Sequence, residues 1–236
     1  MTRRLATGLV LLAALAACNA TGLTEWRQGG TAGRAMVCKP EGAGPFPAVV
    51  YNHGLIVDRD GLSAASGKGY DMAGMCRALA GEGILAFFPV RASGLGHLRN
   101  HLTEVEAALE AVRARPDVDP NRVVLAGFSR GGLLTMVAAA RGASARAFVI
   151  MAPAPGRGMF DRVVPRAAGI AAPVLVMVEA GDSADIRGNV DSLEAALRGG
   201  RVPHRVIRYD RGGGHKLFYG AGYWWRDYVD FLKNPG

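Results

Sequence analysis

Cysteine is scarce in this chain of 236 residues, which has three, Cys18, Cys38 and Cys76. No C-x-x-C pair occurs, so the sequence indicates neither a thiol-redox site nor a cysteine-based zinc site. Dense Lys/Arg clusters with interleaved aromatic residues are missing, although the net charge is +8, which argues against a nucleic-acid-binding protein. Beyond the first 17 residues no apolar stretch is long enough to cross a membrane. Repeats and low-complexity linkers are absent as well, so the rest of the chain is predicted to be one domain.

Two cysteines, Cys38 and Cys76, lie in the predicted domain. The first falls in a predicted strand and the second in a predicted helix. We expect two separate buried thiols. A disulfide between them is the alternative, which an exported compartment would permit.

The amino-terminal segment has the order of a bacterial export signal. Met1-Thr2-Arg3-Arg4 is basic, and residues 5–17 are apolar, rich in Ala and Leu, and too short to span a bilayer comfortably. The step Leu15-Ala16-Ala17-Cys18 resembles a lipobox, in which cleavage precedes the cysteine and its thiol carries a diacylglyceryl group. An ordinary secretory signal cleaved after Ala17 or Ala20 is the alternative.

This resemblance sets the expected organisation and location. Residues 1–17 would be the signal peptide, the Gly/Thr-rich residues 18–33 a tether, and residues 34–236 the folded domain. The resemblance implies that Cys18 anchors the protein in a lipid bilayer of the cell envelope. Where the cell has an outer membrane, we expect the periplasmic side of that membrane. The oligomeric state stays open.

After the tether, short apolar runs alternate with runs of helical spacing. Continuous apolar strands separated by helices predict an α/β fold with a mostly parallel, doubly wound sheet covered on both faces. The segment 152–172 is too short for a large lid domain. The expected strands are 34–38, 48–52, 84–88, 122–126, 145–151, 173–178 and 204–209, and the expected helices are 70–80, 102–114, 132–140, 189–197 and 223–232.

The most informative motif is Gly127-Phe128-Ser129-Arg130-Gly131, which lies between a predicted strand and a predicted helix. A G-x-S-x-G turn in that place is typical of a nucleophile elbow, which holds a serine hydroxyl out at the edge of a sheet. The sharp turn crowds the backbone on both sides of the serine, and glycine avoids the resulting clash because it has no Cβ. Ser129 is therefore the candidate nucleophile.

A serine hydroxyl needs a base and the base needs a carboxylate, and both follow predicted strands. His215 follows the last strand on a loop of three glycines, and Asp182 follows the strand 173–178. Ligands bind beyond the carboxyl ends of the strands in such a sheet, so these side chains are expected to converge. The order Ser, acid, His is that of the α/β-hydrolases. Asp185 and Glu179 remain alternatives for the acid.

The oxyanion of an acyl-transfer intermediate needs backbone N–H donors. The residue after the nucleophile, Arg130, supplies one. Asn52-His53-Gly54-Leu55 follows the strand 48–52 and resembles the His-Gly oxyanion loop of lipases and esterases, so Leu55 is the expected second donor. His53 is expected to orient this loop through hydrogen bonds.

Over roughly residues 34 to 232 the chain resembles an α/β-hydrolase of the dienelactone hydrolase-like group. The matching stretches are Tyr51-Asn52-His53-Gly54, the run from Ala78 to Ile84 leading to Arg91, Asp117 to Val123 before the elbow, and Gly213-Gly214-His215. The resemblance implies a serine hydrolase that cleaves a small-molecule carboxylic ester through an acyl-enzyme without metal or organic cofactor. Two departures stand out. Dienelactone hydrolases proper have Cys where Ser129 stands, which favours a general ester, and Glu179 replaces a Gly usual three residues before the acid.

Two rival functions fit the same sequence. A peptidase or amidase would use the same machinery, and a non-catalytic envelope binding protein could retain the fold. The spacing of His97 and His101, with Glu104 beyond, weakly resembles a metal site. A polar loop at the mouth of the pocket is the preferred interpretation of these two histidines.

Overall fold

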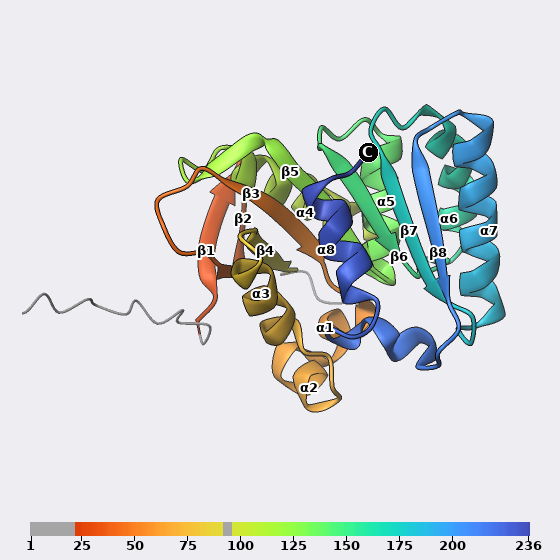
Figure 1. The fold of residues 1–236 in the computed structure, drawn as a ribbon, viewed down its shortest axis with the longest axis horizontal. Coiled ribbons are helices and arrows are strands. Elements are labelled where there is room, and N and C mark those ends of the chain that lie inside the picture. The colour runs from red at the N-terminus through yellow and green to blue at the C-terminus, as the bar shows by residue number, and fades with distance from the viewer. Residues whose placement is uncertain (1–21, 92–95) are drawn as a thin grey trace, which may run out of the picture.

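The structure is a computed structural model that describes residues 22–91 and 96–236 (Figure 1). Cys18 and the predicted signal peptide therefore lie outside the described residues. The strands of the structure are β1 (Thr24–Gln28), β2 (Thr31–Cys38), β3 (Phe46–Asn52), β4 (Leu85–Val90), β5 (Val118–Phe128), β6 (Ala147–Met151), β7 (Val174–Glu179) and β8 (His204–Tyr209).

The α-helices are α1 (Leu55–Asp60), α2 (Leu62–Gly67), α3 (Met72–Gly81), α4 (Leu98–Arg113), α5 (Arg130–Ala140), α6 (Met159–Val163), α7 (Ala184–Gly199) and α8 (Trp225–Lys233). Two 3-10 helices, η1 (Val164–Gly169) and η2 (Gly214–Tyr219), complete the described elements.

The strands form an eight-stranded sheet in the order β1-β2-β4-β3-β5-β6-β7-β8. The pairs β1/β2 and β2/β4 are antiparallel, and all pairs from β4 to β8 are parallel. The predicted α/β-hydrolase fold, with a mostly parallel sheet and no large lid domain, is confirmed. Because β3, β5, β7 and β8 run in one direction, their carboxyl ends meet at one edge of the sheet.

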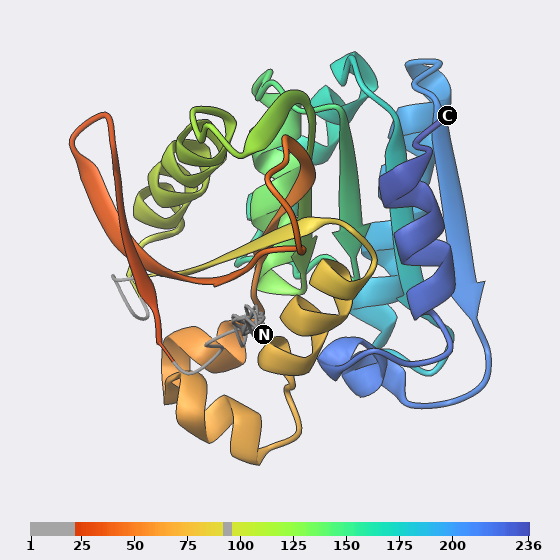
Figure 2. The same cartoon turned by 60° about the vertical axis from the view of Figure 1, so that its left-hand side comes forward.

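Helices cover both faces of this sheet. Helices α3 and α8 lie on one face and α4, α5 and α7 on the other (Figures 1 and 2). Every residue of β6 and β7 is buried, as expected for parallel strands covered on both sides. Helix α5 lies at the centre, and Gly131 to Ala139 are all buried. This burial fixes the helix that follows the candidate nucleophile.

The predicted tether is too long. Residues 24–28 form β1, which pairs with β2, so the sheet begins ten residues before the predicted domain boundary at residue 34. Trp26 packs edge-to-face on Phe87 with ring centroids 6.2 Å apart. Three of the five residues of β1 are exposed and none is buried, so this strand lacks the apolar run or alternation that marks a strand in a sequence.

The expectation of two separate thiols is wrong. Cys38 at the end of β2 and Cys76 in α3 form a disulfide, with Cα atoms 5.6 Å apart. Both residues are buried, as predicted. Helix α3 packs on β2, so residues 38 apart in sequence become neighbours, and local pattern does not reveal that contact.

Helix α4 begins four residues earlier than predicted, and this changes the interpretation of the two histidines. His97 is the residue before the helix, whereas His101 is buried within its first turns. Only His97 is therefore at the mouth of the pocket.

Across residues 22–91 and 96–236, no helix has both the length and the apolarity that crossing a membrane requires.

Candidate active site

Ser129 occupies a sharp turn between β5 and α5. Its backbone is in an unusual conformation with φ 56° and ψ −114°, which strains a non-glycine residue and is typical of functional sites. A Cβ on Gly127 would collide with the backbone of Gly131, and a Cβ on Gly131 with the backbone of Asn52. These contacts explain why the elbow needs both glycines. The main chain of Ser129 is fixed by a hydrogen bond from its N–H to the Met151 carbonyl at 2.9 Å.

The structure brings the three predicted side chains together. Ser129 Oγ lies 2.9 Å from His215 Nε2, and His215 Nδ1 lies 2.7 Å from Asp182 Oδ2. The Asp182 side chain is 2% exposed and that of His215 is 35% exposed. The carboxylate is thus shielded, while the imidazole reaches solvent. This is the arrangement in which a carboxylate fixes the tautomer of an imidazole that can accept a serine proton.

The imidazole is also held by the aromatic ring before the nucleophile. The ring of Phe128 lies 4.7 Å from that of His215, centroid to centroid, and it contacts Phe218 and Tyr219 of η2 as well. The segment that carries His215 therefore packs on the elbow itself, and this contact helps to hold the imidazole beside the Ser129 hydroxyl.

Of the three candidate carboxylates, Asp182 is the one that contacts the imidazole, and the two alternatives have other positions. Asp182 Oδ1 accepts a hydrogen bond from the Ser183 N–H at 2.7 Å, leaving Oδ2 for the imidazole. Asp185 is exposed in the first turn of α7, where the helix dipole stabilises a negative charge.

Glu179 fastens two loops. Its Oε2 accepts the N–H groups of Gly181 at 2.7 Å and Gly214 at 3.0 Å, and its Oε1 accepts that of Gly212 at 3.1 Å. The side chain, 2% exposed, joins the loop of the acid to the loop of the imidazole. Sequence reasoning weighed Glu179 only as an acid. Glu179 stands where dienelactone hydrolase-like proteins usually have a glycine, and this departure was the available signal that it joins the two loops.

The two expected oxyanion donors, Leu55 and Arg130, are each the first residue of a helix, α1 and α5. N–H groups in the first turn of a helix have no acceptor within the helix, so they are available to a ligand. Both residues line the same cavity as Ser129. Both N–H groups therefore remain candidates for the oxyanion donors.

The loop before α1 is held by His53 and Tyr70, both fully buried. Tyr70 Oη accepts the N–H of Gly54 at 3.2 Å, and the Arg91 N–H donates to His53 Nε2 at 3.3 Å. Burial, reinforced by the neighbouring charge of Arg91, lowers the pKa of His53 well below its usual value. The imidazole is therefore neutral, and it orients the loop as predicted.

A buried ion pair lies behind this loop. Arg91 donates to both carboxylate oxygens of Asp58, through Nε at 2.8 Å and Nη2 at 2.7 Å, and the two side chains are 2% and 0% exposed. Arg91 Nη2 also donates to the carbonyl oxygen of His53 at 2.7 Å. Bidentate pairs of this kind fix geometry. Sequence reasoning gave Asp58 no role, because nothing local links it to a residue 33 positions away.

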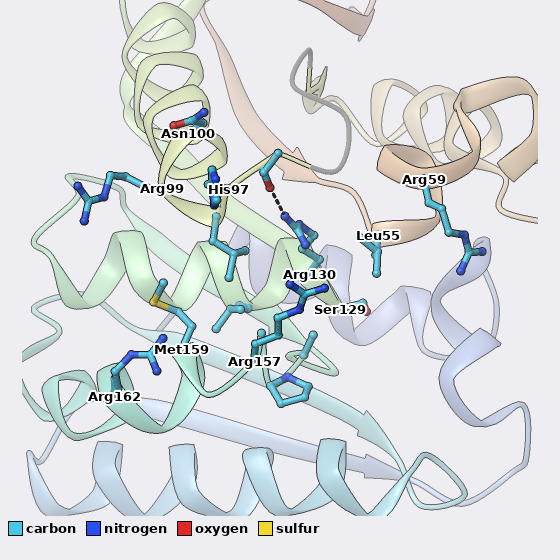
Figure 3. Close-up of a pocket in the computed structure, with 16 residues that line it drawn as sticks. Leu55, Arg59, His97, Arg99, Asn100, Ser129, Arg130, Arg157, Met159 and Arg162 are labelled. Atoms are coloured by element: carbon cyan, nitrogen blue, oxygen red, sulfur yellow. Dashed lines mark hydrogen bonds between the residues drawn. The ribbon is translucent and has the colours of Figure 1, made fainter.

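The side chain of Arg130 extends this network. Its Nε lies 3.6 Å from Asp58 Oδ2 and donates to His101 Nδ1 at 3.1 Å, while its Nη2 donates to the Gly96 carbonyl at 2.9 Å. Figure 3 shows this last bond beside Ser129. The residue expected to supply one oxyanion amide is thus linked through its side chain to the helix expected to supply the other.

Ser129 opens into a cavity of about 1030 Å³, here called the active-site cavity. Figure 3 shows it bounded by Leu55 and Arg59 near the serine, by His97 to Asn100 at the start of α4, and by Met159 and Arg162 of α6. Within residues 22–91 and 96–236, no group of three or more His, Cys, Asp or Glu side chains is placed to hold a metal ion.

Fold and site together define a hydrolase of the α/β-hydrolase type. The model of the dienelactone hydrolase family matches residues 93–219, more than half of the chain. The chain belongs to this family. No curated protein matches it.

Solved structures share the fold at low sequence identity. A protein assigned as a dienelactone hydrolase from Klebsiella pneumoniae subsp. pneumoniae MGH 78578 is 22% identical, with a TM-score of 0.69 over 90% of this chain and 98% of that one. Thermogutta terrifontis esterase 2 phosphoramylated by tabun is 14% identical, with a TM-score of 0.68 over 93% and 96%. Porphyromonas gingivalis dipeptidyl peptidase 4 is 16% identical, with a TM-score of 0.69 over 90% of this chain and 35% of that longer one.

Proposed function

We propose that this protein is a serine hydrolase that cleaves carboxylic esters through an acyl-enzyme. The observation that carries the proposal is the pair of hydrogen bonds at His215, 2.9 Å to Ser129 Oγ and 2.7 Å to Asp182 Oδ2. The first places a base on the hydroxyl, and the second supplies the charge that stabilises the protonated base.

In the acylation step, Ser129 Oγ attacks the carbonyl carbon of the ester while its proton moves to His215 Nε2. The tetrahedral intermediate collapses when the bond between the carbonyl carbon and the alcohol oxygen breaks. The imidazolium returns its proton to that oxygen, and the alcohol leaves. Asp182 accepts the Nδ1–H throughout and keeps Nε2 directed at the serine.

Deacylation repeats the steps with water. His215 Nε2 takes a proton from water, whose oxygen attacks the acyl carbon. The second intermediate breaks at the bond to Ser129 Oγ, and the imidazolium protonates that oxygen. In both steps the negative charge on the former carbonyl oxygen is accepted by the N–H groups of Leu55 and Arg130. Each donor is expected to lower the barrier by about 3 kcal/mol.

Labelling with a fluorophosphonate tests nucleophile and activation together. We expect the label on the tryptic peptide that contains Ser129, and no label on Ser129→Ala or His215→Ala variants of unchanged melting temperature. Labelling at another serine would refute the proposal, and so would the absence of labelling of the folded wild-type protein. A panel of nitrophenyl esters and aminoacyl nitroanilides then separates an esterase from a peptidase or amidase. We expect turnover of the esters.

We further propose that the protein is anchored at the cell envelope through a lipid on Cys18. The buried disulfide between Cys38 and Cys76 supports an exported location, because disulfides persist in oxidising compartments. A Cys18→Ser variant is expected to move from the membrane fraction to the soluble fraction and to lose incorporation of labelled fatty acid. An unchanged distribution would refute the lipid anchor and leave the hydrolase proposal intact.

A further inference from the structure

The active-site cavity continues away from Ser129 along α5. Leu133 of α5 and Met159 of α6 line it, with His97, Arg99 and Asn100 at the start of α4 on the opposite side (Figure 3). Its apolar lining also includes Ala154 and Pro155. A pocket of this size with an apolar wall suits an extended organic substrate.

A second hollow of about 190 Å³, the side cavity, extends this path. It shares Leu98, Arg99, Leu133 and Met159 with the active-site cavity. Its remaining apolar lining is Leu102, Leu134, Val137 and Val163. The two hollows therefore share an apolar wall that leads from Ser129 along α5 toward the C-terminal end of that helix.

The charge around this path has one sign. Arg59, Arg99, Arg130, Arg157 and Arg162 line the active-site cavity, and none of its 16 lining residues is Asp or Glu. Arg59 pairs with Asp60, and Arg130 lies 3.6 Å from Asp58. Within the described part of the chain, Arg99, Arg157 and Arg162 form no ion pair with a carboxylate. An apolar wall bordered by three such guanidinium groups suits a ligand that carries its own negative charge.

The backbone of Arg157 has a conformation that residues other than glycine rarely adopt. It has φ 54° and lies between Gly156 with φ 55° and Gly158 with φ 78°. Positive φ is uncommon for residues other than glycine because their Cβ crowds the backbone, and here the glycines on both sides of Arg157 share it. Figure 3 shows its side chain beside Arg130, close to Ser129. Burial lowers the pKa of Arg130 against the opposing effect of Asp58, and the charges of Arg91 and Arg157 lower it further. Two cationic side chains therefore lie near each other at the wall of the active-site cavity, where an anionic group of the substrate can pair with Arg157.

We propose that the substrate is an anionic amphiphile, an ester with an aliphatic chain that lies over Leu133 and Met159 and a carboxylate or phosphate that pairs with Arg157. This inference rests on the proposed ester hydrolase activity and specifies its substrate class. Arg99 and Arg162, further along the cavity, bind an anion carried at the end of a longer chain.

Two matched pairs of esters test the class and show which part of the substrate carries the charge. On the acyl side, 4-nitrophenyl octanoate is compared with mono-4-nitrophenyl suberate, which adds a terminal carboxylate. On the alcohol side, 1-octanoylglycerol is compared with its 3-phosphate. We expect kcat/KM to favour the anionic member of at least one pair by about two- to fivefold, as for a charge pair with an exposed arginine. The preference should shrink as salt rises from about 0.05 M to about 0.5 M.

Arg157→Gln is the diagnostic variant, and Arg201→Gln is its control. Arg201 has the same left-handed backbone, φ 54°, but is exposed at the end of α7 and lines neither cavity. We expect Arg157→Gln to abolish most of the about two- to fivefold preference for the anionic ester, while Arg201→Gln keeps the wild-type preference. Melting temperatures of both variants show whether each is folded.

The possible outcomes separate the two proposals. Equal kcat/KM within both pairs would overturn the anionic class while leaving the hydrolase intact, and so would an unchanged preference in folded Arg157→Gln. Turnover of no ester, together with absence of fluorophosphonate labelling, would instead refute the hydrolase itself.

Discussion

The two sides of Ser129 are held by different means. On the side of the base, the backbone N–H groups of two loops converge on one carboxylate, that of Glu179. On the side of the oxyanion donors, guanidinium groups hold the first turn of α1 through the buried carboxylate of Asp58. The first arrangement depends on glycines that bring the backbone close to one acceptor. The second depends on side chains from three distant segments. The comparison shows that only one side depends on buried positive charge.

The largest effect is expected on the side of the base, from Asp182→Asn. Loss of the carboxylate removes the charge that stabilises the imidazolium and allows the wrong tautomer, so kcat should fall about 10⁴-fold. The matched control is Asp185→Asn, three residues away and exposed. Steady-state kinetics on one nitrophenyl ester measures both. A similar loss in Asp185→Asn would mean that the acid has been misidentified.

On the opposite side, Asp58→Asn should affect stability most. It leaves the buried guanidinium of Arg91 without a charged partner, which costs about 3–5 kcal/mol in the free energy of unfolding. Asp191→Asn is the control, because its ion pair with Arg208 is exposed and its loss should cost less than about 1 kcal/mol. Urea unfolding measures both variants. Equal costs would show that the buried pair does not hold α1.

Glu179→Gln should have a smaller effect, about 1–3 kcal/mol. An amide nitrogen would then face a backbone N–H that now donates to the carboxylate. Because the loop of His215 loses part of its support, kcat should fall more than KM rises. Glu82→Gln removes an exposed partner of Lys233 and serves as the control. Thermal unfolding and steady-state kinetics check the prediction, and an unchanged kcat would indicate that Glu179 does not position the base.

The smallest effect concerns pH and His53. Its pKa is lowered by burial in the folded protein, whereas the unfolded chain binds a proton near its usual pKa of 6.5. The unfolded state therefore gains a proton first as pH falls, and stability falls with it. This group should therefore lower the free energy of unfolding as pH falls below about 6.5. Urea unfolding of wild type and His53→Asn across this range should give a shallower slope for the variant. Parallel slopes would contradict a lowered pKa of His53 in the folded protein.

The convergence of the three candidate side chains was predictable because each follows a predicted strand, Ser129 directly and the other two within a few residues. Ser129, Asp182 and His215 follow β5, β7 and β8, and a parallel sheet brings strand ends together whatever the details of packing. The elbow glycines gave a second, local signal, and the contacts around Gly127 and Gly131 agree with it.

What escaped prediction depends on contacts between segments that are far apart in sequence. The ion pair of Asp58 with Arg91 and the disulfide of Cys38 with Cys76 join residues 33 and 38 positions apart. Neither has a periodic pattern. The short edge strand β1 was missed because its exposed side chains look like those of a loop. Periodicity thus identified the buried elements, whereas the ion pair and the disulfide that join them have no signal in the local sequence pattern.

The disulfide has a mechanical consequence. It joins β2 to α3 at the end of the sheet opposite β7 and β8. If the chain hangs from Cys18, any pull on it is first felt by β1 and then by β2. The covalent tie then passes the load into α3 and away from β5, so drag on the tethered molecule would fray the outermost hairpin before it disturbed the elbow.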